Sequence, residues 1–207
     1  MYFIKTPFWL RALYPSCTWR IPTKEKVIYL SFDDGPHPIV TPFVLEQLAK
    51  YNAKASFFCI GKNVAENTSI FNQIIQEGHV VGNHTQNHLN GWNTKTETYI
   101  QNIELAAEKI NSNLFRPPYG RITIAQIKQI KNNLALPQKI IMWDVLSGDF
   151  DISISGEKCT NNVIKYAKAG SIIVFHDSSK AWNRLSVALP TVLEYFSKEG
   201  YQFRALV

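Results

Sequence analysis

Two adjacent carboxylates, Asp33 and Asp34, follow a short apolar run in the segment SFDDGP. Adjacent side chains of an extended segment point in opposite directions, so one carboxylate could bind a cation while the other faces a substrate. The residues Asp-Asp-Gly-Pro are also typical of a simple turn. The pattern by itself leaves both interpretations open.

Two histidines, His84 and His88, are four residues apart in the segment HTQNH. At this spacing two imidazoles share one face of a helical turn and can bind one metal ion. Together with Asp34 they form a set of one carboxylate and two imidazoles, which leaves coordination positions open for water or substrate. Zinc binds such a set well. Histidines with purely structural roles are the alternative.

Two further segments could supply groups for catalysis. In RPPYG, residues 116–120, two prolines and a glycine fix the backbone path, so this loop could direct a backbone N–H toward a developing negative charge. Arg116 could orient a carboxylate by paired hydrogen bonds. His176 follows another apolar run, and histidine is suited to proton transfer near neutral pH. A rigid turn and a structural histidine are the corresponding alternatives.

The elements that must position these residues alternate regularly from residue 27 onward. The expected strands are 27–32, 55–60, 79–82, 114–116, 139–143, 171–175 and 201–206, and the expected helices are 41–50, 63–77, 96–110, 122–132, 158–168 and 186–198. Strands separated by helices pair in parallel through right-handed crossovers. The candidate residues follow the strands, where active sites of parallel α/β folds lie. An open doubly wound sheet and a barrel of about seven strands both fit this pattern.

Composition narrows the class of protein. The chain has 207 residues, which suits one domain, and 45% of them are hydrophobic, which excludes a disordered chain. No apolar run approaches the ~20 residues of a membrane span. The net charge is +6, but the basic residues are spread along the chain, which argues against nucleic acid as a partner. Three scattered cysteines predict reduced thiols.

Residues 1–26 form an aromatic and basic N-terminal extension. Lys5, Pro7, Arg11 and Pro15 interrupt every apolar stretch that could act as a secretory signal, so a cytoplasmic or peripherally membrane-associated location is favoured over secretion. The extension either packs on the domain formed by residues 27–207, across its bottom, or lies on a membrane surface. In the second case the inserted residues are Phe3, Phe8, Trp9, Leu10 and Leu13, with Lys5 and Arg11 among the head groups.

Five motifs together resemble the polysaccharide deacetylases of the NodB-homology family, carbohydrate esterase family 4. In chain order they are SFDDGP at 31–36, HTQNH at 84–88, RPPYG at 116–120, WDVLSGDF at 143–150 and IVFHD at 173–177. The resemblance covers roughly residues 25–207. It implies a single-domain distorted (β/α)7 barrel, expected to be a monomer. The implied activity is metal-dependent removal of N-acetyl groups, in preference to O-acetyl groups, from an acetylated carbohydrate such as an N-acetylglucosamine-containing polysaccharide.

The resemblance also implies a role for each matching residue. Asp33 corresponds to the general base that activates a metal-bound water, and His176 to the general acid. Arg116 is expected to orient Asp33, and Asp149 to support Arg116. The backbone N–H of Tyr119 is expected to stabilise the oxyanion.

The metal ligands implied in the same way are Asp34, His84 and His88. The expected ion is a divalent metal, zinc in the first place, with Co²⁺, Ni²⁺ and Mn²⁺ as alternatives. Phe150 and Val174 are expected to contact the substrate.

Three departures from the family pattern bear on substrate preference more than on reaction type. Ser31 stands where the family usually has Thr, a small change. Phe150 stands where the family often has Trp, and Leu146 stands where many members have Asp. Two other functions stay open at this point. One is a carbohydrate-binding protein with a structural metal, and the other is a metal-dependent amidase that acts on a substrate other than a sugar.

Overall fold

The computed structural model describes residues 2–133 and 135–207. Its strands are β1 (Cys17–Thr18), β2 (Val27–Asp33), β3 (Ser56–Cys59), β4 (Val80–Asn83), β5 (Leu114–Phe115), β6 (Lys139–Ile141), β7 (Val145–Leu146), β8 (Ile172–His176) and β9 (Gln202–Phe203). Its α-helices are α1 (Phe8–Leu13), α2 (Val40–Lys50), α3 (Gly61–Glu66), α4 (Thr68–Gln76), α5 (Thr96–Ala107), α6 (Ile124–Asn132), α7 (Gly156–Tyr166) and α8 (Trp182–Lys198). Two 3₁₀ turns, Gly91–Asn93 and Pro118–Gly120, lie in the connecting loops.

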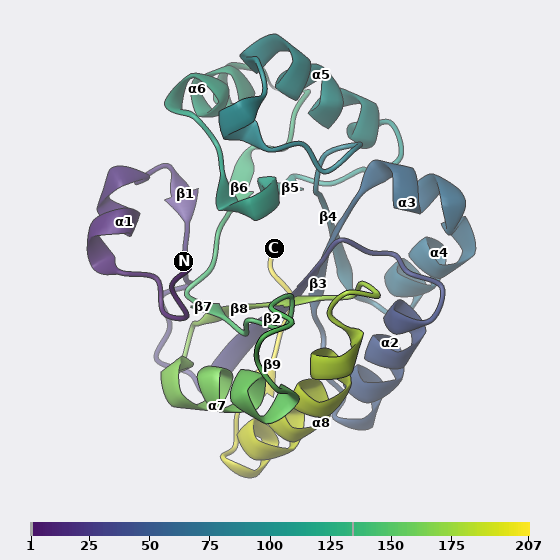
Figure 1. Cartoon of the computed structure of the whole chain (residues 1–207), viewed down its shortest axis with the longest axis vertical. Coiled ribbons are helices and arrows are strands. Elements are labelled where there is room, and N and C mark those ends of the chain that lie inside the picture. Colours follow the sequence, from purple (N-terminus) through teal and green to yellow (C-terminus); the bar gives the residue numbers. More distant parts are fainter. Residues whose placement is uncertain (1, 134) are drawn as a thin grey trace.

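The strands form one curled sheet in the order β1-β6-β5-β4-β3-β2-β8-β7, with β9 paired to β2. All of these strand pairs are parallel. Figure 1 shows the helices arranged around the outside of the strands. From β2 to β6 the neighbouring strands follow chain order, as in a barrel and unlike a doubly wound sheet. The predicted distorted (β/α)7 barrel is confirmed.

Apolar residues fill two layers of this fold. The larger core lies between the sheet and the surrounding helices, where the stacked rings of Phe32, Phe57 and Phe175 meet the buried faces of α2 and α8. A smaller cluster, centred on Phe58, contains only strand and C-terminal residues and fills the barrel interior. Because both faces of the strands are covered, their sequences are predominantly apolar and do not alternate with polar residues.

Two predicted elements are divided in the structure. The helix expected over 63–77 is broken at Asn67, whose side chain donates to the backbone carbonyls of Asn63 and Pro36. The strand expected over 139–143 ends at Ile141, and the chain then crosses to the other end of the sheet, where β7 pairs with β8. Periodicity describes one segment at a time and therefore does not detect either break.

The predicted strand 201–206 is shorter than expected. Of these residues only Gln202–Phe203 form a strand, β9, which pairs with Val27 and Ile28 at the start of β2. The chain then turns into the barrel, where Leu206 is buried and its N–H donates to Ser56. Figure 1 accordingly shows the C-terminus near the centre of the ring of helices.

The N-terminal segment, residues 2–26, fills the gap in the barrel wall between β6 and β7. β1 pairs with β6 in parallel, while Lys5 forms an antiparallel bridge with Val145 of β7. The carboxylate of Asp144, which is fully buried, forms ion pairs with Lys5 and Arg11. The segment therefore contacts both edges of the open sheet.

The same segment presents several apolar side chains to solvent. Phe3, Phe8, Trp9 and Leu13 are exposed, whereas Leu10 is partly buried against the core. The two cations expected among lipid head groups, Lys5 and Arg11, are instead bound to Asp144. Contact with a membrane surface stays a prediction. Among the described residues no helix combines the length and the apolar character that crossing a bilayer requires.

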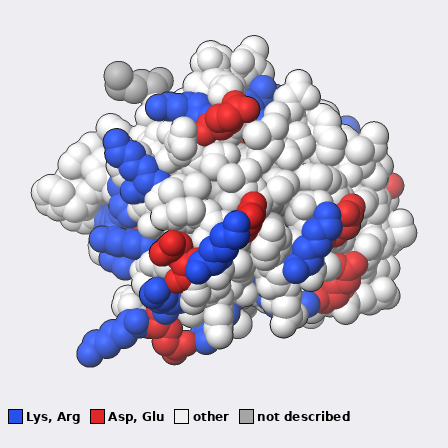
Figure 2. Space-filling view, turned by 90° about the horizontal axis from the view of Figure 1, so that it is seen from below, with Lys and Arg blue, Asp and Glu red and all other residues white. Residues whose placement is uncertain are grey.

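Charges on the helical side of the molecule are mixed. Figure 2 shows acidic and basic side chains interspersed across the face seen from below, with basic ones more frequent toward its left edge. Ion pairs one helical turn apart, such as Lys50 with Glu46, are exposed and contribute little to stability.

Candidate active site

Asp33 and Arg116 form a buried ion pair at the carboxyl ends of β2 and β5. Nη1 of Arg116 lies 2.6 Å from Oδ1 of Asp33 and also donates to the hydroxyl of Ser31. Nε and Nη2 donate to the backbone carbonyls of Ile141 and Met142. The guanidinium, which is fully buried, is thus held by partners on β2 and at the end of β6, and it fixes the orientation of Asp33.

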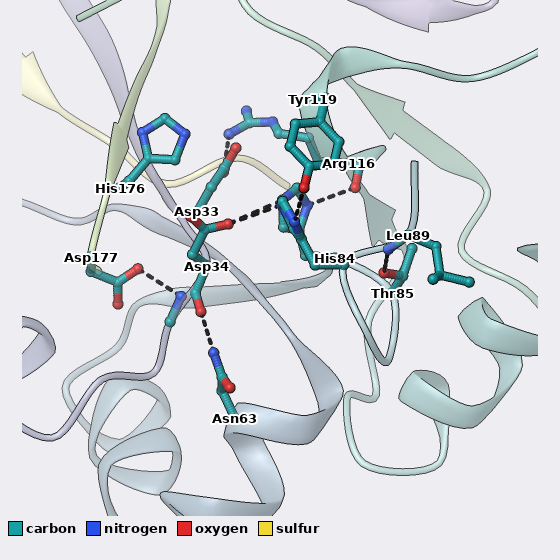
Figure 3. Close-up of polar contacts among 12 residues, drawn as sticks. Asp33, Asp34, Asn63, His84, Thr85, Leu89, Arg116, Tyr119, His176 and Asp177 are labelled. Carbon is teal, nitrogen blue, oxygen red and sulfur yellow. Dashed lines mark hydrogen bonds and ion pairs between the residues drawn. The ribbon is translucent and has the colours of Figure 1, made fainter. Parts of the chain in front are cut away.

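Asp34 leaves the strand with a positive φ of 81°. Asn63 of α3 donates to its backbone carbonyl at 2.7 Å and so helps to hold this uncommon conformation. The carboxylate of Asp34 consequently turns away from Arg116 and toward two histidines (Figure 3). The two carboxylates are separated as the sequence suggested, but a left-handed residue and not the alternation of a strand separates them.

Asp34, His84 and His88 present three ligand atoms that lie within 4.8 Å of one another. Oδ1 of Asp34 is 3.7 Å from Nε2 of His84 and 3.2 Å from Nε2 of His88. The expected helical turn between the histidines is absent from these described residues. Residues 84–88 form a loop in which Thr85 and His88 have positive φ, and the Thr85 hydroxyl accepts from the N–H of Leu89.

Nδ1 of each histidine contacts a group outside the cluster, which leaves Nε2 of each histidine available to a ligand. Nδ1–H of His84 donates to the backbone carbonyl of Arg116 at 2.8 Å, which places the lone pair on Nε2. Nδ1 of His88 and the hydroxyl of Tyr119 are 3.1 Å apart. Burial lowers the pKa of His84 to about 4, so this imidazole is neutral at pH 7, as a metal ligand must be.

A divalent cation fits this cluster. Oδ1 of Asp34 is buried without a hydrogen-bond partner in the described part of the chain, a state that is costly unless a cation or proton compensates it. Burial alone acts to raise the pKa of Asp34. Contact with His88 and the nearby imidazoles of His176 and His84 outweigh it and hold this pKa well below its usual range. Two imidazoles and one carboxylate match the ligand types of catalytic zinc sites.

His176, at the end of β8, lies on the other side of Asp33 from the metal cluster (Figure 3). The β2–β8 register places it directly beside Asp33. Asp149 holds it twice, because one carboxylate oxygen contacts Nδ1 at 2.7 Å and the other accepts the backbone N–H at 2.7 Å. Burial acts to lower the pKa of His176, but the negative charge of Asp149 raises it to about 9.

The prediction that Asp149 supports Arg116 is therefore wrong. Asp149 bonds to His176, and Arg116 finds its partners in Asp33, Ser31 and two backbone carbonyls. The physical reason is the sheet order, which places the loop after β7 next to β8 and away from β5.

The loop after β5 brings Tyr119 to the opposite side of the site. Tyr119 and Gly120 both have positive φ, and a Cβ on Gly120 would lie 2.5 Å from the ring of Trp143. This close contact requires glycine at that position. The loop thereby places Tyr119 at the same cavity that Asp33 and Asp34 line.

A cavity of about 660 Å³ opens over these groups. Phe150 and Val174 line it, and so do Leu146, Trp143 and residues of the N-terminal segment. The ring of Phe150 meets the imidazole of His176 edge-on, with 5.3 Å between the centroids. The structure thus gathers all ten sequence-predicted site residues around one site with a polar floor and an apolar side: Asp33, Asp34, His84, His88, Arg116, Tyr119, Asp149, Phe150, Val174 and His176.

Comparison with known proteins decides the family. The family model for polysaccharide deacetylases matches residues 20–137 of this chain. The chain belongs to the polysaccharide deacetylase family. It is 37% identical over 193 residues to a peptidoglycan-N-acetylglucosamine deacetylase of Bacillus cereus, a match that covers 90% of this chain and 89% of the relative.

Other members of the polysaccharide deacetylase family are similarly close. A chitooligosaccharide deacetylase of Azorhizobium caulinodans is 36% identical over 166 residues, which covers 76% of this chain and 77% of the relative. The crystal structure of a peptidoglycan N-acetylglucosamine deacetylase bound to 4-naphthalen-1-yl-N-oxidanyl-benzamide superposes with a TM-score of 0.85. It is 32% identical and covers 97% of this chain and 95% of its own. The chain is thus a hydrolase of the polysaccharide deacetylase class, whose members depend on a metal ion.

Several residues that support this deacetylase site were not found by sequence reasoning. Asp177 is buried and accepts from the N–H of Gly35 and the hydroxyl of Thr41, and its own N–H donates to the backbone carbonyl of Asp33. Burial raises the pKa of Asp177 to about 8. A Cβ on Gly35 would lie 2.0 Å from this carboxylate, which explains the glycine. The sequence indicated a role for Asp177 only through its position next to His176, and it gave no indication of a role for Asn63 or Thr41.

Proposed function

We propose that this polysaccharide deacetylase removes the N-acetyl group from N-acetylglucosamine residues of a polymer of the peptidoglycan or chitin type. The relatives named above carry such activities in their names. The main support for this proposal is that the adjacent carboxylates of Asp33 and Asp34 face different partners. Asp33 is held by Arg116 and faces the cavity, whereas Asp34 is turned toward two imidazoles.

Asp34, His84 and His88 hold the metal ion in this proposal, and zinc suits their ligand types best. Bound there, the ion supplies Lewis acidity, which polarises the acetyl carbonyl and acidifies water. Asp33 accepts the proton of the water that attacks the carbonyl carbon. Arg116 keeps the Asp33 carboxylate oriented and compensates its charge throughout this step.

The remaining groups act on the other atoms of the amide. The backbone N–H of Tyr119 donates to the oxygen as negative charge develops on it. His176, with Nδ1 held by Asp149, directs Nε2 into the cavity and protonates the nitrogen of the leaving sugar amine. An amide nitrogen must be protonated before it leaves, whereas an ester does not need this, because an alkoxide leaves more readily than an amide anion. The position of His176 therefore favours amide over ester substrates. Phe150 and Val174 provide apolar contacts on the same side of the cavity.

Acetate release from N-acetylglucosamine oligomers and from purified peptidoglycan tests the proposal. The assay is run after chelation and again after zinc is restored. Zinc-dependent release by the wild-type protein, lost in Asp33→Asn although this variant still binds zinc, is the expected result. Release that survives chelation would contradict the metal assignment. A zinc-loaded, folded protein that hydrolyses simple amides but no acetylated sugar would overturn the substrate class.

A further inference from the structure

The N-terminal segment supplies part of the wall next to the catalytic residues. Leu146 of β7 lines the cavity, and its backbone N–H donates to the carbonyl of Ile4 at 2.8 Å. Thr6 continues the contact, because its N–H donates to the carbonyl of Asp144 and its hydroxyl to that of Trp143. Residues 4–6 thus pair with the edge that β7 would otherwise leave open. These hydrogen bonds hold the backbone of β7, and with it Leu146, in place beside the cavity.

Tyr2 precedes residues 4–6 in the same segment, and its side chain contacts the loop that follows β7. Its hydroxyl donates to Oδ2 of Asp151 at 2.7 Å, and its ring meets Phe150 edge-on at 5.0 Å. The hydroxyl also lies close above Gly148, where a Cβ would come within 3.2 Å of it. Phe150 therefore contacts both the ring of Tyr2 and the imidazole of His176.

The segment is anchored independently of Tyr2. Lys5 and Arg11 both bind the buried carboxylate of Asp144, which also accepts from the hydroxyl of Ser171 on the neighbouring strand end. A change at Tyr2 therefore alters the wall of the cavity without releasing the segment from the barrel.

We propose that Tyr2 is a specificity-determining residue that limits the size of the acyl group accepted by the cavity. This inference rests on the proposed function, because it concerns the acyl group that Asp33 and His176 would cleave. Leu146, Val174 and Phe150 are apolar side chains close to this pair, so the alkyl part of the acyl group belongs among them. Because Phe150 packs against both Tyr2 and His176, the ring of Tyr2 restricts the movement of Phe150 that a larger group would require.

The experiment compares N-acetyl and N-propionyl derivatives of the same glucosamine oligomer. The wild-type protein, Tyr2→Ala, Tyr2→Phe and Phe8→Ala are assayed with zinc for kcat and KM on each substrate. Phe8 belongs to the same segment but is 83% exposed, and it does not line the cavity, so Phe8→Ala is the matched control. Thermal unfolding of each variant shows that it is folded.

We expect Tyr2→Ala to raise the propionyl-to-acetyl ratio of kcat/KM by about tenfold, the effect of one methylene in an apolar pocket. Tyr2→Phe keeps the ring against Phe150 and is expected to leave this ratio within about twofold of wild type, as is Phe8→Ala. The pH profile of kcat is expected to be the same in all four proteins, since Asp33 and His176 are unchanged.

An unchanged ratio in a folded Tyr2→Ala protein overturns the inference. A fall in activity that is equal for both acyl groups also overturns it, because a purely structural role has that effect. Aryl acetate and propionate esters, assayed in parallel, separate the two proposals. A wild-type protein that cleaves the esters but no glucosamine derivative contradicts the proposed function, and the ester ratio still decides the role of Tyr2.

Discussion

Asp149 binds both the ring and the backbone of His176, with 2.7 Å to Nδ1 and 2.7 Å to the backbone nitrogen. One carboxylate thereby sets the direction of the imidazole, its tautomer and its affinity for a proton. Because Nδ1 is occupied, the nitrogen that can exchange a proton with a substrate is Nε2.

The pH dependence of activity is expected to shift in Asp149→Asn. Asp149 raises the pKa of His176 to about 9, so wild-type His176 is protonated at neutral pH and loses its proton as the pH rises through that value. Without the negative charge this pKa falls, and the alkaline limb of the kcat profile moves to lower pH by at least ~1 unit. Glu157→Gln removes an exposed carboxylate from α7 and serves as the control. An unshifted alkaline limb in Asp149→Asn would contradict the role of His176 as the acid.

The buried pair of Asp33 and Arg116 is expected to behave as one unit. Arg116→Met leaves Asp33 as an uncompensated buried charge and should lower the free energy of unfolding by about 3–5 kcal/mol. Asp33→Asn/Arg116→Met should lose less than the sum of the two single changes. Urea unfolding of the four proteins measures this coupling. Additive losses would show that the two side chains do not stabilise each other.

Metal binding is expected to stabilise the fold through the Asp34 cluster. Zinc at about 100 times its dissociation constant should raise the free energy of unfolding by about 2.7 kcal/mol. His88→Ala should lose most of this gain. His37→Asn should keep it, because His37 lies outside the cluster and its Nδ1 accepts from the N–H groups of Ile39 and Val40, a role that Asn can fill. Equal stabilisation of His88→Ala and wild type would refute this ligand set.

The ionised carboxylate of Asp144 is expected to stabilise the protein at neutral pH but not at strongly acidic pH. Burial acts to raise its pKa, but its hydrogen bonds to Lys5 and Ser171 and the charges of Lys5 and Arg11 lower the pKa below the usual value. A carboxylate with a depressed pKa contributes stability above pH ~4 and loses it as the pH falls through the folded-state value. Asp144→Asn should therefore cost about 3 kcal/mol at pH 7 and progressively less below pH 4.

A control for that experiment is Glu25→Gln, which removes an exposed ion pair with Arg204. It should change stability by less than about 1 kcal/mol at any pH. A pH-independent effect of Asp144→Asn would mean that its packing, and not its charge, holds the N-terminal segment.

The catalytic end of the barrel could be predicted because its geometry follows from short-range patterns. Parallel strands of similar length end at one edge of a sheet, so residues directly after apolar runs meet there. Asp33 and His176 illustrate this, since they are neighbours in the β2–β8 register although 143 positions separate them. Seven strand patterns separated by helical ones were sufficient to predict a parallel α/β fold and the location of the site, whereas the choice of a barrel over an open sheet came from the resemblance to the polysaccharide deacetylases.

Features that depend on distant or left-handed residues could not be predicted. The loop that joins His84 and His88 requires positive φ at two residues that are not glycine, and one of them, Thr85, is β-branched and disfavours this conformation. The ion pairs of Asp144 connect it to Lys5 and Arg11, more than 130 positions away, and only the gap in the sheet brings them together. The partner of Asp149 likewise depended on which strand its loop lies beside.

The closure of the barrel by the N-terminal segment also sets an order of assembly during synthesis. Lys5 lies 139 positions before Asp144, and Tyr2 lies 149 positions before Asp151. The segment leaves the ribosome before its binding partners, which are synthesised more than 130 residues later. At synthesis rates of ≈ 5–20 residues/s this separation corresponds to several seconds or more, and the part of the cavity wall that the segment supplies cannot form before then.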